Sequence, residues 1–459
     1  MTLSGPTKEP TLRELRGRFS RGEDTPLAAT QRMFDRIDAL DSELHAFLAT
    51  DRETAYAAAE LATEAWEGSG SKPPLLGIPI SVKDTIEVAG MPTTYGSQLF
   101  RTNRQPDSVV AQRLRAAGAI IVGKTNTPEF ALITEVRNRL TPPGTNPLDH
   151  ARTAGGSSGG AATSVAAGMS VAALGTDSAG SIRIPAAYQG LVGFKPSYQR
   201  IPWVQTWKAS LTRSHVGPIT QDVADAWELT QILSGIDWRD PSSRWSGLQE
   251  RQFSDHRALN HRQFRAAVLT DDGEDCNAED RRLLEELIAE VEQRFESVER
   301  LQWREVLPAS QPTGAGGWTY AGEHVAGALA LCPELPDRLD ELTEYARPHY
   351  EWGLEQPAHE YLRGVGDDRL RGLHLAHELG RFDCVFTLSA SEAPLLAPEE
   401  SYVPKGFPLL GALNLAGLPA VSIPFGRYES GMPRAIQVVG RYGEDARILA
   451  IAEQFAHSE

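Results

Sequence analysis

The chain has 459 residues, of which 41% are hydrophobic and 23% are charged, a composition typical of a globular protein with a sizeable core. Its 61 acidic residues outnumber the 45 basic ones, and the net charge of −16 argues against nucleic acid or an anionic membrane surface as a partner. The three cysteines, Cys276, Cys332 and Cys384, are scattered without metal-ligand or disulfide spacing, so we expect buried free thiols and no metal. The opening residues lack the pattern of a secretory signal, which predicts a cytoplasmic protein.

In the first third of the chain, helical and strand patterns alternate. A helix is expected after Thr25, a good N-cap residue followed by Pro26 at the first helical position. The next patterns predict a helix over 51–66, a strand over 75–84, and a helix, glycine stop and strand over 107–126. Alternation of this kind indicates an α/β architecture with a largely buried sheet.

The middle and end of the chain are less uniform. Residues 144–160 are dense in Gly, Ser, Thr and Pro and are predicted to form a loop, whereas 170–174 favour a buried strand. Further expectations are a strand near Arg265, an amphipathic helix over 278–295, strands at 420–426 and 434–441, and a closing helix over 444–455, whereas the pattern over 303–404 is less regular. We find no internal repeat and no linker, so a single domain over 1–459 is expected, with a semi-independent region over about 200–405.

Lys83 is the first candidate for chemistry, because it ends the apolar stretch "GIPISVKD". A lysine among buried apolar residues loses hydration, its pKa falls, and its neutral amine becomes a competent general base. The alternative is a surface lysine paired with Asp84.

The stretch "GGSSGG", at 155–160, is the second candidate. It contains the G-x-S-x-G pattern of a nucleophile elbow twice, but an elbow needs a preceding strand, and "NPLDHARTAG" does not have the pattern of one. It also lacks the GK[ST] ending of a phosphate loop. A flexible loop is an equally open interpretation.

The third candidate is "GTDSAGSIRIPAA", at 175–187, where small residues separate a strand from a possible helix. Small residues let a ligand approach the backbone, and unpaired N–H groups at a helix start suit an oxyanion that develops during acyl transfer. Ser181 is the candidate nucleophile here. The alternative is that Ser181 only caps the helix.

Together these three stretches resemble the amidase signature family of Ser–Ser–Lys amide hydrolases. The resemblance is strengthened by five further motifs in the same order: "VGKTNTPEF", "GLVGFKPS", "SHVGPIT", "GIDWRDP" and "NLAGLPAVSIP". It implies a large mixed, mostly buried sheet covered on both faces by helices, a catalytic core at about 70–200 and a variable substrate-pocket region at about 200–405. It also implies no cofactor, a small-molecule amide substrate, and a homodimer as a common arrangement.

The resemblance assigns roles to individual residues. Ser181 would be the nucleophile. Ser157, 24 positions earlier, would relay the proton of Ser181 to a neutral Lys83, and the Gly156–Ser157 peptide bond would be cis. The backbone N–H groups of Ser178, Ala179, Gly180 and Ser181 would form the oxyanion hole. Ser158, Asp177 and Arg183 would be supporting residues. His215 is expected to be structural.

Two departures from the family pattern bear on the site. Ala179 stands where the family usually has glycine, and alanine fits this position without backbone strain only if its φ is negative. Leu388 replaces a common proline, which affects pocket shape at most.

The branch of the family and the substrate are less sharply indicated. Ile184 and "RSHVG" differ from the pattern of the tRNA-dependent amidotransferase and favour a stand-alone hydrolase of an amide, hydrazide or carbamoyl group. The alternatives are the amidase subunit of that amidotransferase, a catalytically silent binding protein, and an elbow-type hydrolase with Ser157 or Ser158 as nucleophile. Trp203, Trp207 and Trp318 suggest a pocket for an apolar or aryl acyl group, although tryptophans are mostly core residues.

Overall fold

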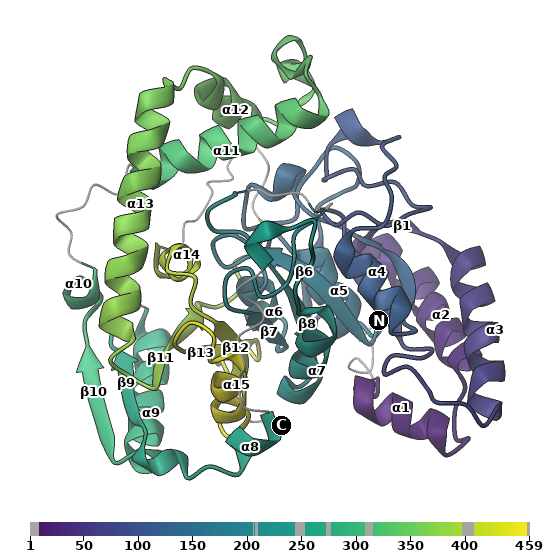
Figure 1. The fold of residues 1–459 in the computed structure, drawn as a ribbon, viewed down its shortest axis with the longest axis horizontal. Coiled ribbons are helices and arrows are strands. Elements are labelled where there is room, and N and C mark those ends of the chain that lie inside the picture. The colour runs from purple at the N-terminus through teal and green to yellow at the C-terminus, as the bar shows by residue number, and fades with distance from the viewer. Residues whose placement is uncertain are drawn as a thin grey trace.

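The computed structural model describes residues 9–204, 206, 210–243, 253–271, 277–307, 315–396 and 408–456. Its strands are β1 (Phe47–Thr50), β2 (Pro79–Lys83), β3 (Ile120–Thr125), β4 (Thr145–Asn146), β5 (Asp149–Thr153), β6 (Ala172–Asp177), β7 (Val192–Lys195), β8 (His215–Thr220), β9 (Arg265–Leu269), β10 (Ser297–Leu301), β11 (Cys384–Ala390), β12 (Ala420–Arg427) and β13 (Pro433–Val439). All but β4 and β5 form one 11-stranded sheet in the order β1-β3-β2-β6-β8-β7-β12-β13-β11-β9-β10 (Figure 1). Parallel and antiparallel neighbours are mixed, as predicted.

Helices surround this sheet. They are α1 (Leu12–Ser20), α2 (Pro26–Leu44), α3 (Arg52–Glu67), α4 (Val109–Ala116), α5 (Gly159–Ala166), α6 (Arg183–Tyr188), α7 (Val223–Leu233), α8 (Phe253–Arg257), α9 (Ala278–Arg294), α10 (Trp303–Val306), α11 (Ala315–Leu331), α12 (Ala346–Leu354), α13 (Ala358–Leu379), α14 (Pro408–Leu415) and α15 (Asp445–Glu453). Short 3-10 turns are η1 (Gln98–Phe100), η2 (Glu129–Ala131), η4 (His261–Gln263), η5 (Leu335–Asp337) and η6 (Leu339–Glu341).

The alternation of side chains along the strands explains why helices cover both faces of the sheet. On β9, Ala266 and Val268 join a hydrophobic cluster with α7, α9 and α15. Their neighbours Ala267 and Leu269 point to the opposite face and join a second cluster with α13 and α14. Successive strand residues face opposite sides, so a strand that is apolar throughout needs a helix layer on each side. The predicted fold class is confirmed.

Local signals placed several elements correctly. The Thr25 hydroxyl accepts a hydrogen bond from the Ala28 N–H at 3.1 Å, and α2 begins at Pro26. Gly118, with a φ of +89°, makes the turn between α4 and β3, a conformation that glycine adopts without a steric penalty. The helix over 278–295 and the two late strands also form, within a few residues of the predicted bounds.

One regional prediction is wrong. Residues 144–160 are not one loop, because β4 and β5 pair as a hairpin and α5 begins at Gly159. Residues 315–331, 346–354 and 358–379, where the sequence pattern is less regular, form α11, α12 and the 22-residue α13, which lie together in Figure 1. These helices carry many polar and small residues, which weakens the apolar periodicity on which a prediction from sequence depends.

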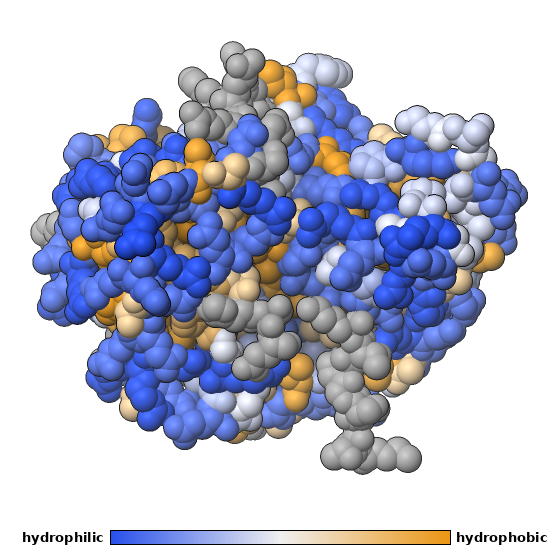
Figure 2. Space-filling model, turned by 90° about the horizontal axis from the view of Figure 1, so that it is seen from below, coloured by the Kyte–Doolittle hydropathy of each residue, from blue (hydrophilic) through white to orange (hydrophobic). Residues whose placement is uncertain are grey.

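Two of the three cysteines, Cys332 and Cys384, are buried free thiols, whereas Cys276 lies outside the described residues. Hydrophilic residues dominate the face seen in Figure 2, and hydrophobic ones are scattered over it. Across the described ranges, none of the helices combines the length and apolar character needed to cross a bilayer.

Candidate active site

Lys83 is the last residue of β2, and its side chain is fully buried. The alternation along "ISVK" puts Ile80 and Val82 into the hydrophobic cluster that contacts α1 and α4. Ser81 points to the other face, where its hydroxyl lies 2.8 Å from that of Ser164 on α5. Lys83 is two residues further along, so it shares the α5 side of the sheet with Ser81.

The amine of Lys83 is surrounded by hydroxyl groups. Its Nζ lies 2.7 Å from Ser157 Oγ, 3.0 Å from Ser158 Oγ and 3.0 Å from Thr176 Oγ1. Burial lowers the pKa of Lys83 well below its ordinary range, against a smaller opposing effect of the Asp177 charge. Asp84 does not pair with Lys83: it forms a buried ion pair with Lys124 at 2.8 Å. Burial therefore favours the neutral form of the Lys83 amine, which lies in hydrogen-bonding reach of two serines.

The two serines come from the "GGSSGG" stretch, which connects β5 to α5. The strand β5 ends only two residues before Gly155, so the absence of a preceding strand no longer argues against a nucleophile elbow. Close packing explains the glycines: a Cβ on Gly156 would lie 2.7 Å from the Glu135 nitrogen, and Gly155 has a φ of +77°. The Gly156–Ser157 peptide bond is cis.

The stretch around Ser181 continues β6 into a tight turn before α6. β6 runs parallel to β2, so the carboxyl ends of the two strands, at Asp177 and Lys83, lie at the same edge of the sheet. The Ser158 N–H donates to the Ser181 carbonyl oxygen at 3.0 Å, which fixes the two loops against each other. Ser181 itself is 9% exposed. The structure thus brings Lys83, Ser157, Ser158 and Ser181 together from three distant stretches.

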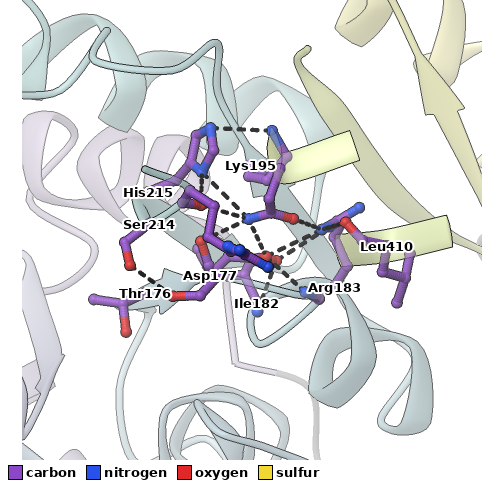
Figure 3. Close-up of polar contacts among 12 residues, drawn as sticks. Thr176, Asp177, Ile182, Arg183, Lys195, Ser214, His215 and Leu410 are labelled. Atoms are coloured by element: carbon purple, nitrogen blue, oxygen red, sulfur yellow. Dashed lines mark hydrogen bonds and ion pairs between the residues drawn. The ribbon is translucent and has the colours of Figure 1, made fainter. Parts of the chain in front are cut away.

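Asp177 and Arg183, on either side of Ser181 in the sequence, form a buried ion pair (Figure 3). Both side chains are fully buried, and the Arg183 guanidinium donates to the Asp177 carboxylate at 3.0 and 3.1 Å. Arg183 also donates to the Leu410 carbonyl, to Asn414 and to Gln437. Burial alone would raise the pKa of Asp177, but the charge and hydrogen bonds of Arg183 hold that pKa well below its usual range.

The Asp177 carboxylate also determines which backbone N–H groups of the turn already have a hydrogen-bond acceptor. It accepts hydrogen bonds from the N–H of Gly180 at 2.7 Å and from that of Ile182 at 3.1 Å. The Gly180 N–H is therefore already used, which corrects its predicted role as an oxyanion donor in this conformation. Gly180 has a φ of +106°, whereas Ala179 is outside the positive-φ region, so alanine at 179 causes no backbone strain.

We expect Gly180→Ala to slow acyl transfer by about 10²-fold, because displacing the backbone donors of an oxyanion hole lowers the rate by about that factor. The added Cβ would lie 2.5 Å from Leu410 and 2.9 Å from Ile184, on a backbone that alanine rarely adopts. The measurement is the rate at which a fluorophosphonate labels Ser181. Ala179→Gly is the matched control and should label within a few-fold of the wild type; equal rates for both variants would contradict this explanation.

His215 and Lys195 lie next to each other near Asp177. The His215 Nδ1 lies 2.9 Å from the Arg213 carbonyl oxygen, and its Nε2 lies 3.3 Å from Lys195 Nζ. Burial lowers the pKa of His215 well below its ordinary range and that of Lys195 to about 7. Figure 3 shows both side chains beside Asp177. A structural role for His215 stays a prediction.

The three tryptophans are placed unequally. Trp203 is 4% exposed and packs in a core cluster with residues of β2, α4 and α7. Trp207 lies outside the described residues, and of Trp318 only its position in α11 is described. Leu388 is a buried residue of β11.

Two residues of the site were not singled out from sequence. Thr176 contacts the Lys83 amine, and its position next to Asp177 at the end of β6 was the available signal. Asn414 donates to the Asp177 carboxylate at 2.9 Å and to its carbonyl at 2.8 Å. Asn414 is the first residue of the motif "NLAGLPAVSIP", which is the sequence signal for its position.

Comparison with known proteins agrees with this geometry. A sequence model described as Amidase matches residues 28–347. A subunit of the glutamyl-tRNA(Gln) amidotransferase of Prochlorococcus marinus (strain MIT 9313) is 32% identical over 96% of this chain and 95% of its own length. A solved structure titled "Crystal structure of amidase" is 31% identical, covers 97% of this chain and 98% of its own, and superposes with a TM-score of 0.83.

The fold is also shared at lower identity. The structure of a bacterial aryl acylamidase of the amidase signature enzymes is 22% identical, covers 98% of this chain and 96% of its own, and has a TM-score of 0.89. The family match over more than half of the chain, with a buried lysine and paired serines at the expected positions, gives one conclusion: the chain belongs to the Amidase family of carbon–nitrogen hydrolases.

Proposed function

We propose that the protein hydrolyses the amide bond of a small molecule through an acyl-enzyme on Ser181. The observation that carries the proposal is the Lys83 amine, fully buried and hydrogen-bonded to Ser157 and Ser158. Within the described part of the chain Lys83 makes no ion pair, so its neutral form is not opposed by a contacting carboxylate. A neutral amine next to a serine hydroxyl is a general base positioned for nucleophilic catalysis.

The first half of the reaction forms the acyl-enzyme. Lys83 accepts the proton of Ser157 as Ser157 accepts the proton of Ser181, and Ser181 Oγ attacks the carbonyl carbon. The N–H groups of Ser178, Ala179 and Ser181 are the donors we assign to the developing oxyanion. When the intermediate collapses, the proton returns through Ser157 to the leaving nitrogen, which departs as an amine or ammonia.

The second half releases the acid. A water molecule gives its proton to the same relay and attacks the acyl carbon, and the carboxylic acid leaves as Ser181 regains its proton. Ser158 positions the amine of Lys83, since its hydroxyl also donates to the Thr176 carbonyl at 3.1 Å. Asp177 and Arg183 hold the turn. Related acyl bonds in esters, hydrazides and carbamoyl groups fit the same relay.

The test is covalent labelling with a serine-reactive fluorophosphonate followed by mass spectrometry. We expect the adduct on Ser181, and we expect Ser181→Ala to abolish it. An adduct on Ser157 or Ser158 would overturn the assignment in favour of an elbow-type hydrolase. The absence of any adduct in the folded protein would favour a silent binding protein.

A second candidate function is that of the amidase component of an amidotransferase, because a relative from such an enzyme is 32% identical over nearly the whole chain. This function needs a stable partner and an acceptor for the released ammonia. Size-exclusion chromatography of the protein purified from its native source distinguishes the two. Amide hydrolysis by the isolated chain, without a co-purifying partner, supports the stand-alone enzyme.

A further inference from the structure

The segment that precedes β8, residues 210–214, contacts the nucleophile turn on one side and the helices α11 and α13 on the other. We call it the bridge segment. Its residues Ser210, Arg213 and Ser214 are buried. Buried polar side chains need hydrogen-bond partners, and here the partners come from parts of the chain that are far apart in sequence. The bridge segment therefore joins α11 and α13 to the turn around Ser181.

Glu323 of α11 binds the bridge segment directly. This residue is 2% exposed. The hydroxyls of Ser210 and Thr212 both donate to its carboxylate oxygen Oε2. A buried carboxylate without donors is costly, so Glu323 and the two hydroxyl groups fix each other's positions. The first residue of the bridge segment is thus tied to α11.

A second carboxylate, from α13, binds the other half of the bridge segment. The Arg213 guanidinium forms an ion pair with Asp368 at 2.5 Å, and both side chains are largely buried. The Arg213 carbonyl oxygen accepts a hydrogen bond from Asn414 Nδ2 at 3.0 Å. The same amide nitrogen donates to Asp177, at the end of β6. Two helices therefore hold the bridge segment against the nucleophile turn.

On the side of the turn, the contacts are hydrogen bonds between serines. The Ser210 N–H donates to Ser214 Oγ at 2.9 Å, and Ser214 Oγ lies 2.7 Å from Ser178 Oγ (Figure 3). A hydroxyl oxygen has two lone pairs and one hydrogen, so that of Ser214 can bond both neighbours at once. A path of hydrogen bonds, which we call the serine path, therefore leads from Glu323 through Ser210 and Ser214 to Ser178.

The serine path differs in kind from the other contacts of α11. Val325 of the same helix packs in an apolar cluster with Phe100 and Phe130. Apolar contacts are not directional, whereas a hydrogen bond weakens steeply when its angle changes. The oxyanion donors of an acyl-transfer site must also be placed precisely, since a misplacement of about 1 Å can cost about 10²-fold in rate. The serine path is therefore the contact of α11 that can set the position of Ser178.

We propose that Glu323 is a positioning residue for the reaction at Ser181, because through Ser210 and Ser214 it fixes the Ser178 N–H as an oxyanion donor. The proposal rests on the proposed amide hydrolysis and deepens it, since it couples α11 to the reaction centre. Glu323 takes no part in the proton relay. The property that the serine path uses is its acceptor oxygen and not its charge.

The test compares the rates at which a fluorophosphonate labels Ser181 in full-length variants. Glu323→Ala removes the acceptor and should slow labelling about tenfold or more, part of the loss of about 10²–10³-fold that follows removal of a whole oxyanion donor. Glu323→Gln keeps an acceptor oxygen for Ser210 and Thr212, so it should label within about threefold of the wild type. A wild-type rate in Glu323→Ala, or an equal loss in both variants, would overturn the proposal.

Two further variants separate the serine path from a general loosening of α11. Val325→Ala, the matched control, removes buried methyl groups from the apolar cluster, and it should lower stability to urea while labelling within about threefold of the wild type. Ser214→Ala interrupts the serine path one step further along. The double variant with Glu323→Ala should be at most about threefold slower than the slower single variant, because both changes break the same path. Losses that multiply would contradict the path. If Glu323→Ala does not fold, Ser210→Ala replaces it.

Hydrogen–deuterium exchange in peptides covering 175–185 tests the coupling without any reaction. Asp177 protects the N–H groups of Gly180 and Ile182, so exchange there should be faster in Glu323→Ala and unchanged in Glu323→Gln. If exchange responds in this way but the wild-type Ser181 is not labelled, the proposed reaction fails and the coupling stands. If the wild type is labelled and Glu323→Ala changes neither exchange nor labelling, the coupling is wrong and the reaction stands.

Discussion

Lys83→Met is expected to lower the rate of Ser181 labelling, and of amide hydrolysis, by about 10⁴-fold, the upper range for loss of a general base. Methionine has nearly the length of lysine but cannot accept a proton. The Ser157 hydroxyl, 2.7 Å from the amine in the wild type, then has no base to receive its proton. Stopped-flow labelling with a fluorogenic phosphonate measures the effect. A loss below tenfold would show that another group is the base.

The same variant should be more stable than the wild type near neutral pH, which separates loss of chemistry from loss of fold. Burial lowers the pKa of Lys83 in the folded state, so the unfolded chain binds more protons between that lowered pKa and the ordinary lysine value. Wild-type stability therefore rises with pH across this window. Urea denaturation should show Lys83→Met above the wild type at pH 7, with the difference shrinking towards pH 10. A difference that does not change with pH would contradict a neutral buried amine.

Arg183→Met is expected to have the largest effect on stability, a loss of about 3–5 kcal/mol in the free energy of unfolding. The substitution leaves the Asp177 carboxylate buried without its cation, and it removes the bonds to Leu410 and Gln437. Labelling of Ser181 should fall as well, because Asp177 holds the N–H groups of Gly180 and Ile182. Urea denaturation at pH 7 gives the stability change.

The pH dependence of stability tests whether the unpaired Asp177 carboxylate causes this loss. In the wild type the lowered pKa of Asp177 contributes stability above the ordinary aspartate value, and this is lost only as pH falls through the lowered pKa. Without Arg183 the pKa of Asp177 rises, so the folded variant binds a proton at a higher pH than the wild type does. The difference in the free energy of unfolding between variant and wild type should therefore narrow below about pH 4. The control is Arg300→Met, at an exposed ion pair with Glu292, which should cost about 1 kcal/mol or less. A similar loss in both variants would refute the buried-pair explanation.

The parts of this molecule that can be predicted from sequence are those marked by patterns among residues close together in the chain. Thr25 and Pro26 mark a helix start because capping depends on neighbouring residues alone. The alternation of "ISVK" carries Lys83 to the polar face of a buried strand, and small residues around Ser181 mark a turn. The proximity of Lys83, Ser157 and Ser181 did not follow from local pattern. It entered through the resemblance of three separate motifs to one family.

What sequence reasoning missed depends on contacts between distant residues. The Gly180 N–H was predicted to face an oxyanion, and only the position of the Asp177 carboxylate shows that it is occupied. Glu323 lies on α11, in a stretch without clear periodicity, and its burial beside Ser210 arises from the way α11 crosses the segment before β8. Burial of a charged residue in a polar-looking stretch is a property of the packed fold, so no local pattern predicts it.

The long sequence distance between Arg183 and two of its partners has a consequence for how the turn around Ser181 forms during synthesis. The side chain that steadies the nucleophile turn is itself held by Asn414 and Gln437, 231 and 254 residues further along the chain. A nascent chain that contains Lys83, Ser157 and Ser181 still lacks Asn414 of α14 and Gln437 of β13 until those elements have been synthesised. In a nascent chain these contacts of Arg183 therefore form only after α14 and β13 have been synthesised, so the turn around Ser181 gains this support late.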